Sequence, residues 1–391
     1  MADVVILGAG PAGLVLGNLL HAQGINCAIL ERAGRAQLGS RARAGFLAAD
    51  TVRTLQRHGL ADGLRRRGRE HRTCEFRTDD GRFRLDYGGL GSGDPHTVYP
   101  QQELVDDLLT QYLDAGGRIS FETEAVAVVG ADGARPAVTA REPDGRPVSW
   151  QARYVAGCDG RHGAARRSLP PGSVRHHRSD HQVSWLGLLV QAPPSLDAVG
   201  YAVHDRGFAG HMARTPEVTR YYLQCDRGSS PDAWSEDRIW DELAARMRAA
   251  DYGALHRGPV LQRTVVDLRS DVLDPLRHGS LFLVGDAGSL LSPSAAKGAN
   301  LAVLEAEILA RALVDDLAQG DPGGLDRYSP TCLAHVWRAQ EFSRWMIRLL
   351  HRTPGQDAGA GFDDELRRSR LEALRTSRVQ QDWFAENYVG I

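Results

Sequence analysis

Lysine is almost absent from this chain of 391 residues. Lysine and arginine together number 47, and only Lys297 is a lysine. We interpret Lys297 as a position where a compact ammonium is wanted and a planar guanidinium would not serve. The formal net charge of -2 gives no reason to expect nucleic acid or an anionic membrane as a partner.

Long apolar runs and paired cysteines are also missing. No apolar run reaches the roughly 18 residues that a membrane-spanning helix needs. The N-terminus runs from Met1 directly into the strand-like VVILG, so a secretory signal is not expected. The cysteines are odd in number, widely spaced and contain no CxxC pair. A zinc or other metal site and a disulfide framework are therefore disfavoured, and free thiols in a reducing cytoplasm are expected.

The length and the hydrophobic share of 42% suit a globular protein of two domains. A strand over 3–8, a helix over 13–23 and a strand over 26–30 predict a doubly wound α/β fold. Further elements are predicted as helices over 101–115, 297–318 and 324–352, strands within 118–129, a hairpin within 138–157, and strands at 185–191, 201–205, 220–226 and 281–285. The alternating segment 73–87 is expected to join the β-rich sheet of 180–268.

The change in character along the chain predicts a Rossmann-like domain interrupted by a β-rich domain, with a helical C-terminal region. The expected ranges are 1–72, 95–179 and 269–391 for the first domain, and 73–94 and 180–268 for the inserted one.

A glycine-rich turn follows the first strand. Its pattern is Gly8, Gly10, Ala12 and Gly13, with Glu31 at the end of the next strand. Such glycines let a helix N-terminus approach a pyrophosphate, and the acid accepts hydrogen bonds from a ribose. The sequence therefore predicts a dinucleotide site, and a tight structural turn is the alternative.

Two later segments decide which dinucleotide binds. Asp159 and Gly160 follow a strand and precede His162, and Gly285 and Asp286 follow another strand ahead of the segment 293–300. Alone, each aspartate would fit a helix cap. In this order they resemble the two conserved aspartate motifs of flavoprotein aromatic hydroxylases.

The resemblance covers essentially the whole chain and points to the 4-hydroxybenzoate 3-hydroxylase family. The matching segments are 39–45, 185–189, 206–208, 220–222, 268–270 and 385–390. The resemblance implies FAD, dioxygen and NADH or NADPH, and hydroxylation of a 4-hydroxybenzoate-type acid through a flavin C4a-hydroperoxide. It also implies a homodimer.

The resemblance assigns cofactor contacts residue by residue. It implies FAD contacts for Arg43, Gln101 and Asn300, and for Gly298 and Ala299 at the start of a helix whose positive end would face the flavin. It implies transient nicotinamide contacts for Arg41, His162 and Arg269. Arg32 could hold a phosphate, so the preference between NADH and NADPH stays open.

The resemblance also assigns the substrate pocket. Arg214 and Tyr222 match the residues that grip the substrate carboxylate, with Arg220 near both flavin and substrate. Tyr201 and Tyr388 match tyrosines that bond the substrate phenol and pass its proton on. The outlet of this relay would be His71, and the carbonyl of Pro293 would meet the substrate hydroxyl.

Departures from the family cluster in the same pocket. Met212 replaces a serine that would donate to the carboxylate, and Gly210, Val199 and Ser294 are smaller than the family's residues. The alternatives are neutral drift, with plain 4-hydroxybenzoate as substrate, or a larger ring such as 3-amino-4-hydroxybenzoate hydroxylated at C2. A pyridine-nucleotide dehydrogenase, a flavin halogenase, an oxidase and an FAD-fold binding protein are weaker alternatives.

Overall fold

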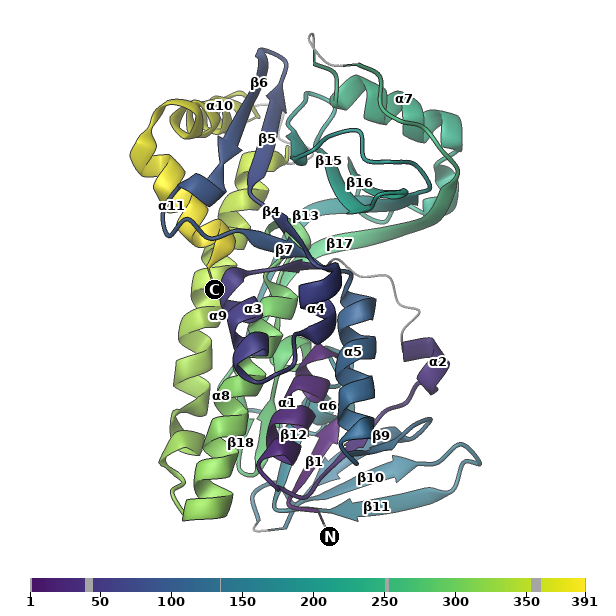
Figure 1. The fold of residues 1–391 in the computed structure, drawn as a ribbon, viewed down its shortest axis with the longest axis vertical. Coiled ribbons are helices and arrows are strands. Elements are labelled where there is room, and N and C mark those ends of the chain that lie inside the picture. The colour runs from purple at the N-terminus through teal and green to yellow at the C-terminus, as the bar shows by residue number, and fades with distance from the viewer. Residues whose placement is uncertain (1, 39–44, 134, 250–252, 353–359, 391) are drawn as a thin grey trace.

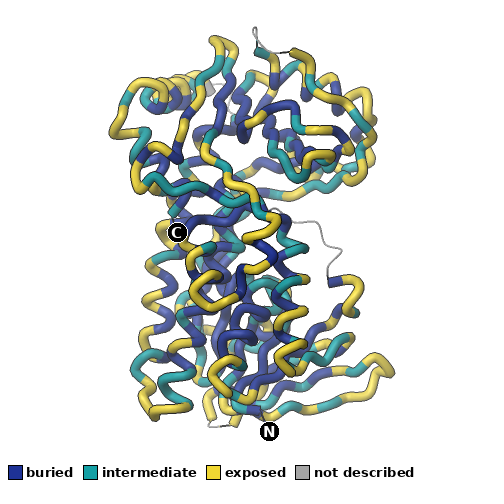
Figure 2. The backbone as a smooth tube through the Cα atoms, viewed as in Figure 1, coloured by how far each residue is buried: buried dark blue, intermediate teal, exposed yellow. Residues whose placement is uncertain are grey.

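Two large sheets organise the chain, and they lie in opposite halves of an elongated molecule (Figure 1). The computed structural model describes residues 2–38, 45–133, 135–249, 253–352 and 360–390. One half holds a six-stranded sheet and the longest helices, and the other holds an eight-stranded sheet. Buried residues run through the middle of both halves (Figure 2). Of the described residues, none belongs to a helix that could cross a membrane.

The six-stranded sheet contains the predicted strand–helix–strand unit. This unit consists of β1 (Val4–Leu7), α1 (Pro11–Ala22) and β2 (Cys27–Leu30). Its two strands pair in parallel. Both strands are buried throughout, as expected where helices cover both faces of a parallel sheet. The sheet is completed by β8 (Arg118–Ser120), β12 (Tyr154–Gly157), β19 (Leu281–Leu283) and the antiparallel edge β18 (Arg277–His278).

Helices cover this sheet. The helix α1 packs against both α5 (Gln101–Asp114) and α8 (Gly298–Gln319), and α8 packs along α9 (Gly323–Leu350). Figure 1 shows α8 and α9 side by side along this half of the molecule. The shorter helices are α2 (Arg35–Leu38), α3 (Ala49–Arg57), α4 (Asp62–Arg67) and α6 (Ala164–Arg167). The α/β class predicted from the sequence is confirmed.

The eight-stranded sheet brings distant segments together. As predicted, the segment 73–87 joins it, through β5 (Thr73–Thr78) and β6 (Gly81–Asp86). The other strands are β13 (Arg175–Val190), β14 (Val199–Ala202), β15 (Ala209–Thr215), β16 (Val218–Cys225), β17 (Val260–Asp274) and β20 (Ser289–Leu290). The predicted domain boundaries near 180 and 268 fall inside the paired strands β13 and β17, and the domain ranges stay a prediction.

Several elements were missed or misassigned from the sequence. The strands within 118–129 do not pair with each other, because Glu122 adopts a left-handed backbone with φ of 52° and redirects the chain. The second strand, β9 (Glu124–Val129), instead pairs in a three-stranded sheet with β10 (Ala137–Arg141), whose other neighbour is β11 (Pro147–Gln151). The missed elements include β15, β17, α3, α4, α7 (Glu236–Arg246), α10 (Ala360–Thr376) and α11 (Arg378–Val389).

A small sheet lies between the two halves. It consists of β3 (Phe46–Leu47), β7 (His96–Val98) and β4 (Arg69–His71), all antiparallel. Figure 1 shows β4 and β7 at the waist of the molecule, near the end of α11. In this sheet His71 pairs with His96, and the His96 ring packs against that of Tyr388 near the C-terminus.

Candidate active site

A cavity of about 740 Å³ extends between the two large sheets. One end is lined from β16 and β17, and the other from the loops that follow β1, β12 and β19. The lining includes twelve residues predicted to hold the cofactor: Gly8, Gly10, Ala12, Glu31, Arg32, Gln101, Asp159, His162, Gly285, Asp286, Gly298 and Ala299. Arg41 and Arg43 lie outside the described residues.

The glycine turn has the shape that a dinucleotide needs. A Cβ on Gly8 would lie 2.6 Å from the carbonyl oxygen of Cys158, and Gly8 has a φ of +94°. A Cβ on Gly13 would lie 2.0 Å from the carbonyl oxygen of Gly8, so only glycine lets α1 start this close to β1. At Gly10 a Cβ would meet nothing within 4 Å, and the backbone there faces the cavity. These residues fit a pyrophosphate at the start of α1.

Two carboxylates complete this end of the cavity. Glu31 accepts hydrogen bonds at 2.8 Å from the backbone N–H groups of Ala9 and Ala33, which fix its orientation. Asp159 accepts one from the N–H of Ala165 at 3.1 Å, and among the described residues its Oδ1 has no partner. Burial raises the pKa of Asp159. A carboxylate oxygen left buried without a donor suits a ligand hydroxyl, so these residues fit FAD.

The start of α8 is fixed by Asn300. Its amide donates to the carbonyls of Phe46 and Ala296 and accepts from the N–H of Ala48. The amide therefore holds the segment around Phe46, which itself lines the cavity. A direct bond from Asn300 to the flavin stays a prediction.

At the other end, three of the predicted substrate residues line the cavity, namely Arg220, Tyr222 and Pro293. Arg220 is 8% exposed, its guanidinium lies 5.6 Å from the Tyr222 ring centroid, and its Nε has no partner among the described residues. Arg214 donates to the side chain of Gln102 at 2.6 Å, and Gln102 lines the cavity. Burial and the nearby Arg220 lower the pKa of Arg214. This end of the cavity is built to receive an anion.

The two predicted tyrosines meet although 187 residues separate them. The hydroxyls of Tyr201, on β14, and Tyr388, on α11, lie 2.6 Å apart. Both side chains are buried, and burial raises the pKa of each phenol. The pair can therefore pass a proton along a hydrogen bond without either tyrosine carrying a lasting charge.

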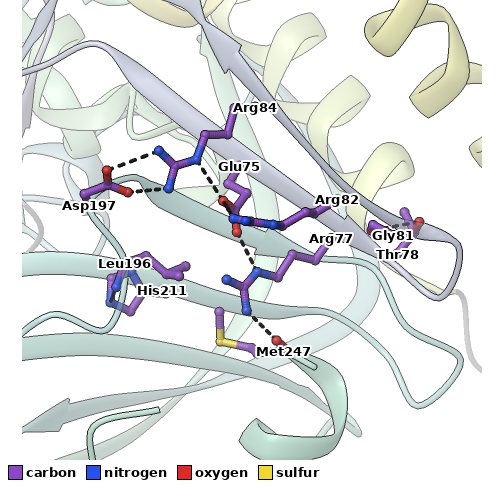
Figure 3. Close-up of polar contacts among 10 residues, drawn as sticks. All are labelled: Glu75, Arg77, Thr78, Gly81, Arg82, Arg84, Leu196, Asp197, His211 and Met247. Carbon is purple, nitrogen blue, oxygen red and sulfur yellow. Dashed lines mark hydrogen bonds and ion pairs between the residues drawn. The ribbon is translucent and has the colours of Figure 1, made fainter. Parts of the chain in front are cut away.

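An ionic network around a buried carboxylate supports the strand beside Tyr201. Glu75, which is fully buried, accepts from Arg77 at 2.7 Å, Arg82 at 2.8 Å and Arg84 at 2.9 Å (Figure 3). Burial alone would raise the pKa of Glu75, but these arginines bring it below its ordinary value. Side chains alternate along a strand, so the neighbouring Phe76 points the other way, toward Tyr201, with ring centroids 5.4 Å apart.

One of the four pocket substitutions behaves differently from the expectation. A Cβ on Gly210 would lie 2.8 Å from Cζ of Phe208, so Phe208 already fills the space that the missing side chain leaves. The hydroxyl of Ser294 lies 3.1 Å from the hydroxyl and from the carbonyl of Ser343. Val199 is buried and Met212 packs against the same apolar cluster. The prediction that Gly210 enlarges the substrate space is therefore corrected.

The predicted nicotinamide contact Arg269 lies apart from the cavity. It donates to Asp267 at 2.8 Å and lies 3.5 Å from Asp180. His162, by contrast, lines the cavity. The structure therefore brings His162, but not Arg269, to the cofactor end.

Comparison with known proteins decides the family. The model of the FAD binding domain family matches residues 1–343. The chain is 37% identical over 388 residues to p-hydroxybenzoate hydroxylase from Acinetobacter baylyi, which covers 99% of this chain and 95% of that one. The chain belongs to the FAD-dependent aromatic hydroxylases.

Other relatives fit the same family. The chain is 29% identical to the 3-amino-4-hydroxybenzoate 2-monooxygenase PtnB3 from Streptomyces platensis, over 87% of this chain and 86% of that one. The structure of p-nitrophenol 4-monooxygenase PnpA from Pseudomonas putida superposes with a TM-score of 0.81 over 100% of this chain and 98% of that one. At 19% identity, that likeness concerns the fold alone.

Sequence reasoning missed four residues of this hydroxylase's site. Gln102 follows Gln101 directly and gave no separate signal. His351 accepts from the indole N–H of Trp185 at 2.5 Å and donates from Nδ1 to the carbonyl of Ile347, and Trp185 lines the cavity. Tyr87 and His96 pack edge-on against the Tyr388 ring, at 5.0 and 4.9 Å between centroids. No motif marks any of them, because each matters through a contact distant in sequence.

Proposed function

We propose that the chain hydroxylates a 4-hydroxybenzoate-type acid ortho to an activating group, using FAD, dioxygen and NADH or NADPH. The observation that supports this most is the buried pair Tyr201 and Tyr388, whose hydroxyl oxygens lie 2.6 Å apart. The pair lies in the same half of the molecule as the arginine-rich end of the cavity. A phenol must lose its proton to become electron-rich enough for attack by an electrophilic oxygen. A carboxylate must be held at the same time. The lining of the cavity supplies Arg220 and Tyr222 for the carboxylate, and the buried tyrosine pair, which is not part of that lining, would serve the phenol.

The carboxylate end is assigned to Arg214, Arg220 and Tyr222. A guanidinium meets a carboxylate through two parallel N–H donors, which fixes the plane of the ring as well as its position. Arg220 carries a buried Nε without a described partner. Pro293 lines the cavity and would offer its carbonyl to the substrate hydroxyl.

The phenol end is assigned to Tyr201. Its hydroxyl would accept the phenol proton while giving its own to Tyr388, so the charge stays on the substrate. His71 is neutral near pH 7, because burial lowers its pKa to about 4, and would take the proton next. The same burial disfavours the imidazolium, so the proton would pass to solvent without staying on the ring.

The cofactor would lie along the glycine turn, Glu31, Asp159, Asp286 and the start of α8. Bound FAD, once reduced by the nicotinamide, supplies the activation of dioxygen. The aromatic side chains of Trp185, which is buried, and Tyr222, which is partly buried, would keep water from the reacting atoms.

A second candidate substrate is 3-amino-4-hydroxybenzoate, hydroxylated at C2. It is supported by Met212, which removes a hydroxyl from the carboxylate end, and by the likeness to PtnB3. The ring of Phe208 occupies the space beside Gly210, which argues for a pocket of ordinary size. We therefore propose plain 4-hydroxybenzoate first.

The test is turnover of each acid by the purified FAD-bound protein, with products identified by mass. Clean conversion of 4-hydroxybenzoate supports the first proposal. Clean conversion of 3-amino-4-hydroxybenzoate only, with hydrogen peroxide formed when 4-hydroxybenzoate is added, supports the second proposal. Peroxide from both acids without product would make the chain an oxidase.

We also infer a cytoplasmic homodimer with the domain ranges given above. The described cysteines are all free thiols, which suits a reducing compartment. Phe362 on α10 and Val379 on α11 are 73% and 75% exposed, which suits a covered face in a dimer. Light scattering on the purified protein measures the oligomeric state.

A further inference from the structure

Tyr87 occupies the space beside both Tyr388 and His71. It opens the 3₁₀ helix Tyr87–Gly89 and is fully buried. Its ring stands edge-on to Tyr388 with centroids 5.0 Å apart, and stacks on His71 with centroids 6.3 Å apart. Tyr87 therefore contacts Tyr388 of the proton-passing pair on one side and the expected outlet His71 on the other. Phe46 also lies against both rings, but it has no hydroxyl with which to bond His71.

Two hydrogen bonds join Tyr87 to His71. The Tyr87 hydroxyl oxygen lies 2.6 Å from the carbonyl oxygen of His71 and 3.0 Å from Nδ1 of its ring. A carbonyl oxygen carries no hydrogen, and two oxygens at 2.6 Å repel unless a proton lies between them. The hydroxyl proton of Tyr87 must therefore point at the carbonyl. The same oxygen can then only accept from the ring, so Nδ1 must carry a hydrogen.

We propose that Tyr87 fixes His71 as the tautomer with hydrogen on Nδ1, so that the lone pair on Nε2 receives the proton that leaves Tyr388. This inference rests on the proposed function, and Tyr87 acts in it as a positioning residue. When the proton is transferred, the O–H bond of Tyr388 breaks, an N–H bond forms at Nε2 of His71, and the His71 ring becomes a cation. The negative charge stays on the substrate phenolate, and release of the Nε2 proton to solvent restores the neutral ring.

The surroundings agree with this assignment. Burial raises the pKa of Tyr87, so its hydroxyl keeps the proton that the carbonyl needs. His96 is the Cα partner of His71 across β4 and β7 and is almost fully buried. Burial and the nearby Lys297 lower the pKa of His96 well below its ordinary value, so it stays neutral and does not oppose a positive charge on His71.

The tautomer can be measured directly on the FAD-bound protein. Nitrogen-15 NMR of histidine-labelled protein distinguishes a protonated ring nitrogen from one with a lone pair, and His71→Gln identifies the His71 signal. The expected result is hydrogen on Nδ1 and none on Nε2 in the unaltered protein, with both tautomers populated in Tyr87→Phe. Hydrogen on Nε2 in the unaltered protein would overturn the proposal, whether or not the variant folds.

The kinetic consequence has its own measurement. Stopped-flow mixing of the oxidised protein with 4-hydroxybenzoate and a pH indicator reports proton release on binding. Tyr87→Phe is expected to slow release roughly tenfold, less than the loss of a general base costs, with the Kd for the acid unchanged within about twofold.

Tyr328→Phe is the matched control, because Tyr328 is equally buried and donates to a carbonyl, that of Leu283, at 2.7 Å. Its release rate should match that of the unaltered protein. An unchanged rate in Tyr87→Phe would overturn the role in proton transfer. Failure of the acid to bind at all would refute the proposed function instead, and would leave the NMR result standing.

Discussion

The ammonium of Lys297 donates to the main-chain carbonyl of Tyr388 at 2.8 Å, and also to that of Gly390. Lys297 immediately precedes α8 and is 2% exposed. The only lysine of the chain therefore ties the cavity end of α8 to the C-terminal segment that carries Tyr388. A compact ammonium with three donors can serve two neighbouring carbonyls, whereas a planar guanidinium would need more room.

Replacing Lys297 by Met should loosen Tyr388 with little loss of stability. Burial and Arg338 lower the pKa of Lys297 to about 7, so removing the amine also removes a desolvation cost. We expect the free energy of unfolding to change by less than about 2 kcal/mol, while hydroxylated product per nicotinamide oxidised falls several-fold. Urea unfolding and product analysis measure the two quantities. A large loss of stability with a normal product yield would show that Lys297 does not hold Tyr388 in position.

Replacing Gln102 by Glu should weaken substrate binding. The new carboxylate would pair with Arg214, which now donates to Gln102 at 2.6 Å, and would compete with the substrate carboxylate. We expect KM for 4-hydroxybenzoate to rise by roughly tenfold, equivalent to about 1.4 kcal/mol, with a smaller change in kcat. Gln102→Leu, which adds no charge, is the control and should raise KM less. An equal rise in KM for the two variants would show that Arg214 does not bind the substrate carboxylate.

Replacing Gly210 by Leu should clash with Phe208 before it touches the substrate. Overpacking of this kind typically costs about 1–3 kcal/mol of stability. Phe208→Ala in the same chain makes room, so the double variant should be more stable than the sum of the two single changes predicts. Unfolding of the four proteins measures this coupling. Additive effects would mean that Phe208 does not fill the Gly210 space.

Acid should destabilise the protein through buried histidines. The pKa of His351 is lowered by burial to about 3, against about 6.5 for an ordinary histidine. Its stabilising contribution is therefore complete above about pH 6.5 and is lost as the pH falls toward 3, because the unfolded chain binds the proton first. Between pH 7 and pH 5 we expect a loss of about 2 kcal/mol from this residue.

His351→Gln keeps an acceptor for the Trp185 indole and cannot titrate. Its free energy of unfolding should therefore fall less between pH 7 and pH 5 than that of the unaltered protein. Urea unfolding at both pH values makes the comparison. The same pH dependence in both proteins would show that His351 is not buried in its neutral form.

The sequence predicted best what local patterns encode. The strand, glycine turn and helix around Gly8 follow from apolar runs and from backbone geometry that only glycine permits. The collinear resemblance was enough to place Tyr201 and Tyr388 in one site, and their hydroxyls do meet.

What the sequence could not predict depends on contacts between distant segments. The strand β17 was missed because its buried and exposed residues follow no simple alternation, although it pairs with β13 along most of its length. The filling of the Gly210 space depends on the position of the Phe208 ring, and the contact between His71 and Tyr87 joins residues sixteen positions apart. Side-chain packing, and not residue type, decided each of these.

The most direct test of the central claim is the ratio of hydroxylated product to NAD(P)H oxidised with 4-hydroxybenzoate, measured on the FAD-bound protein and on Tyr201→Phe. We predict a ratio near one for the unaltered protein. In Tyr201→Phe we predict a turnover rate lower by about 10²–10⁴-fold, as expected for loss of an acid–base group. Nicotinamide oxidation that yields only hydrogen peroxide in the unaltered protein, with neither 4-hydroxybenzoate nor its 3-amino derivative converted, would contradict the account.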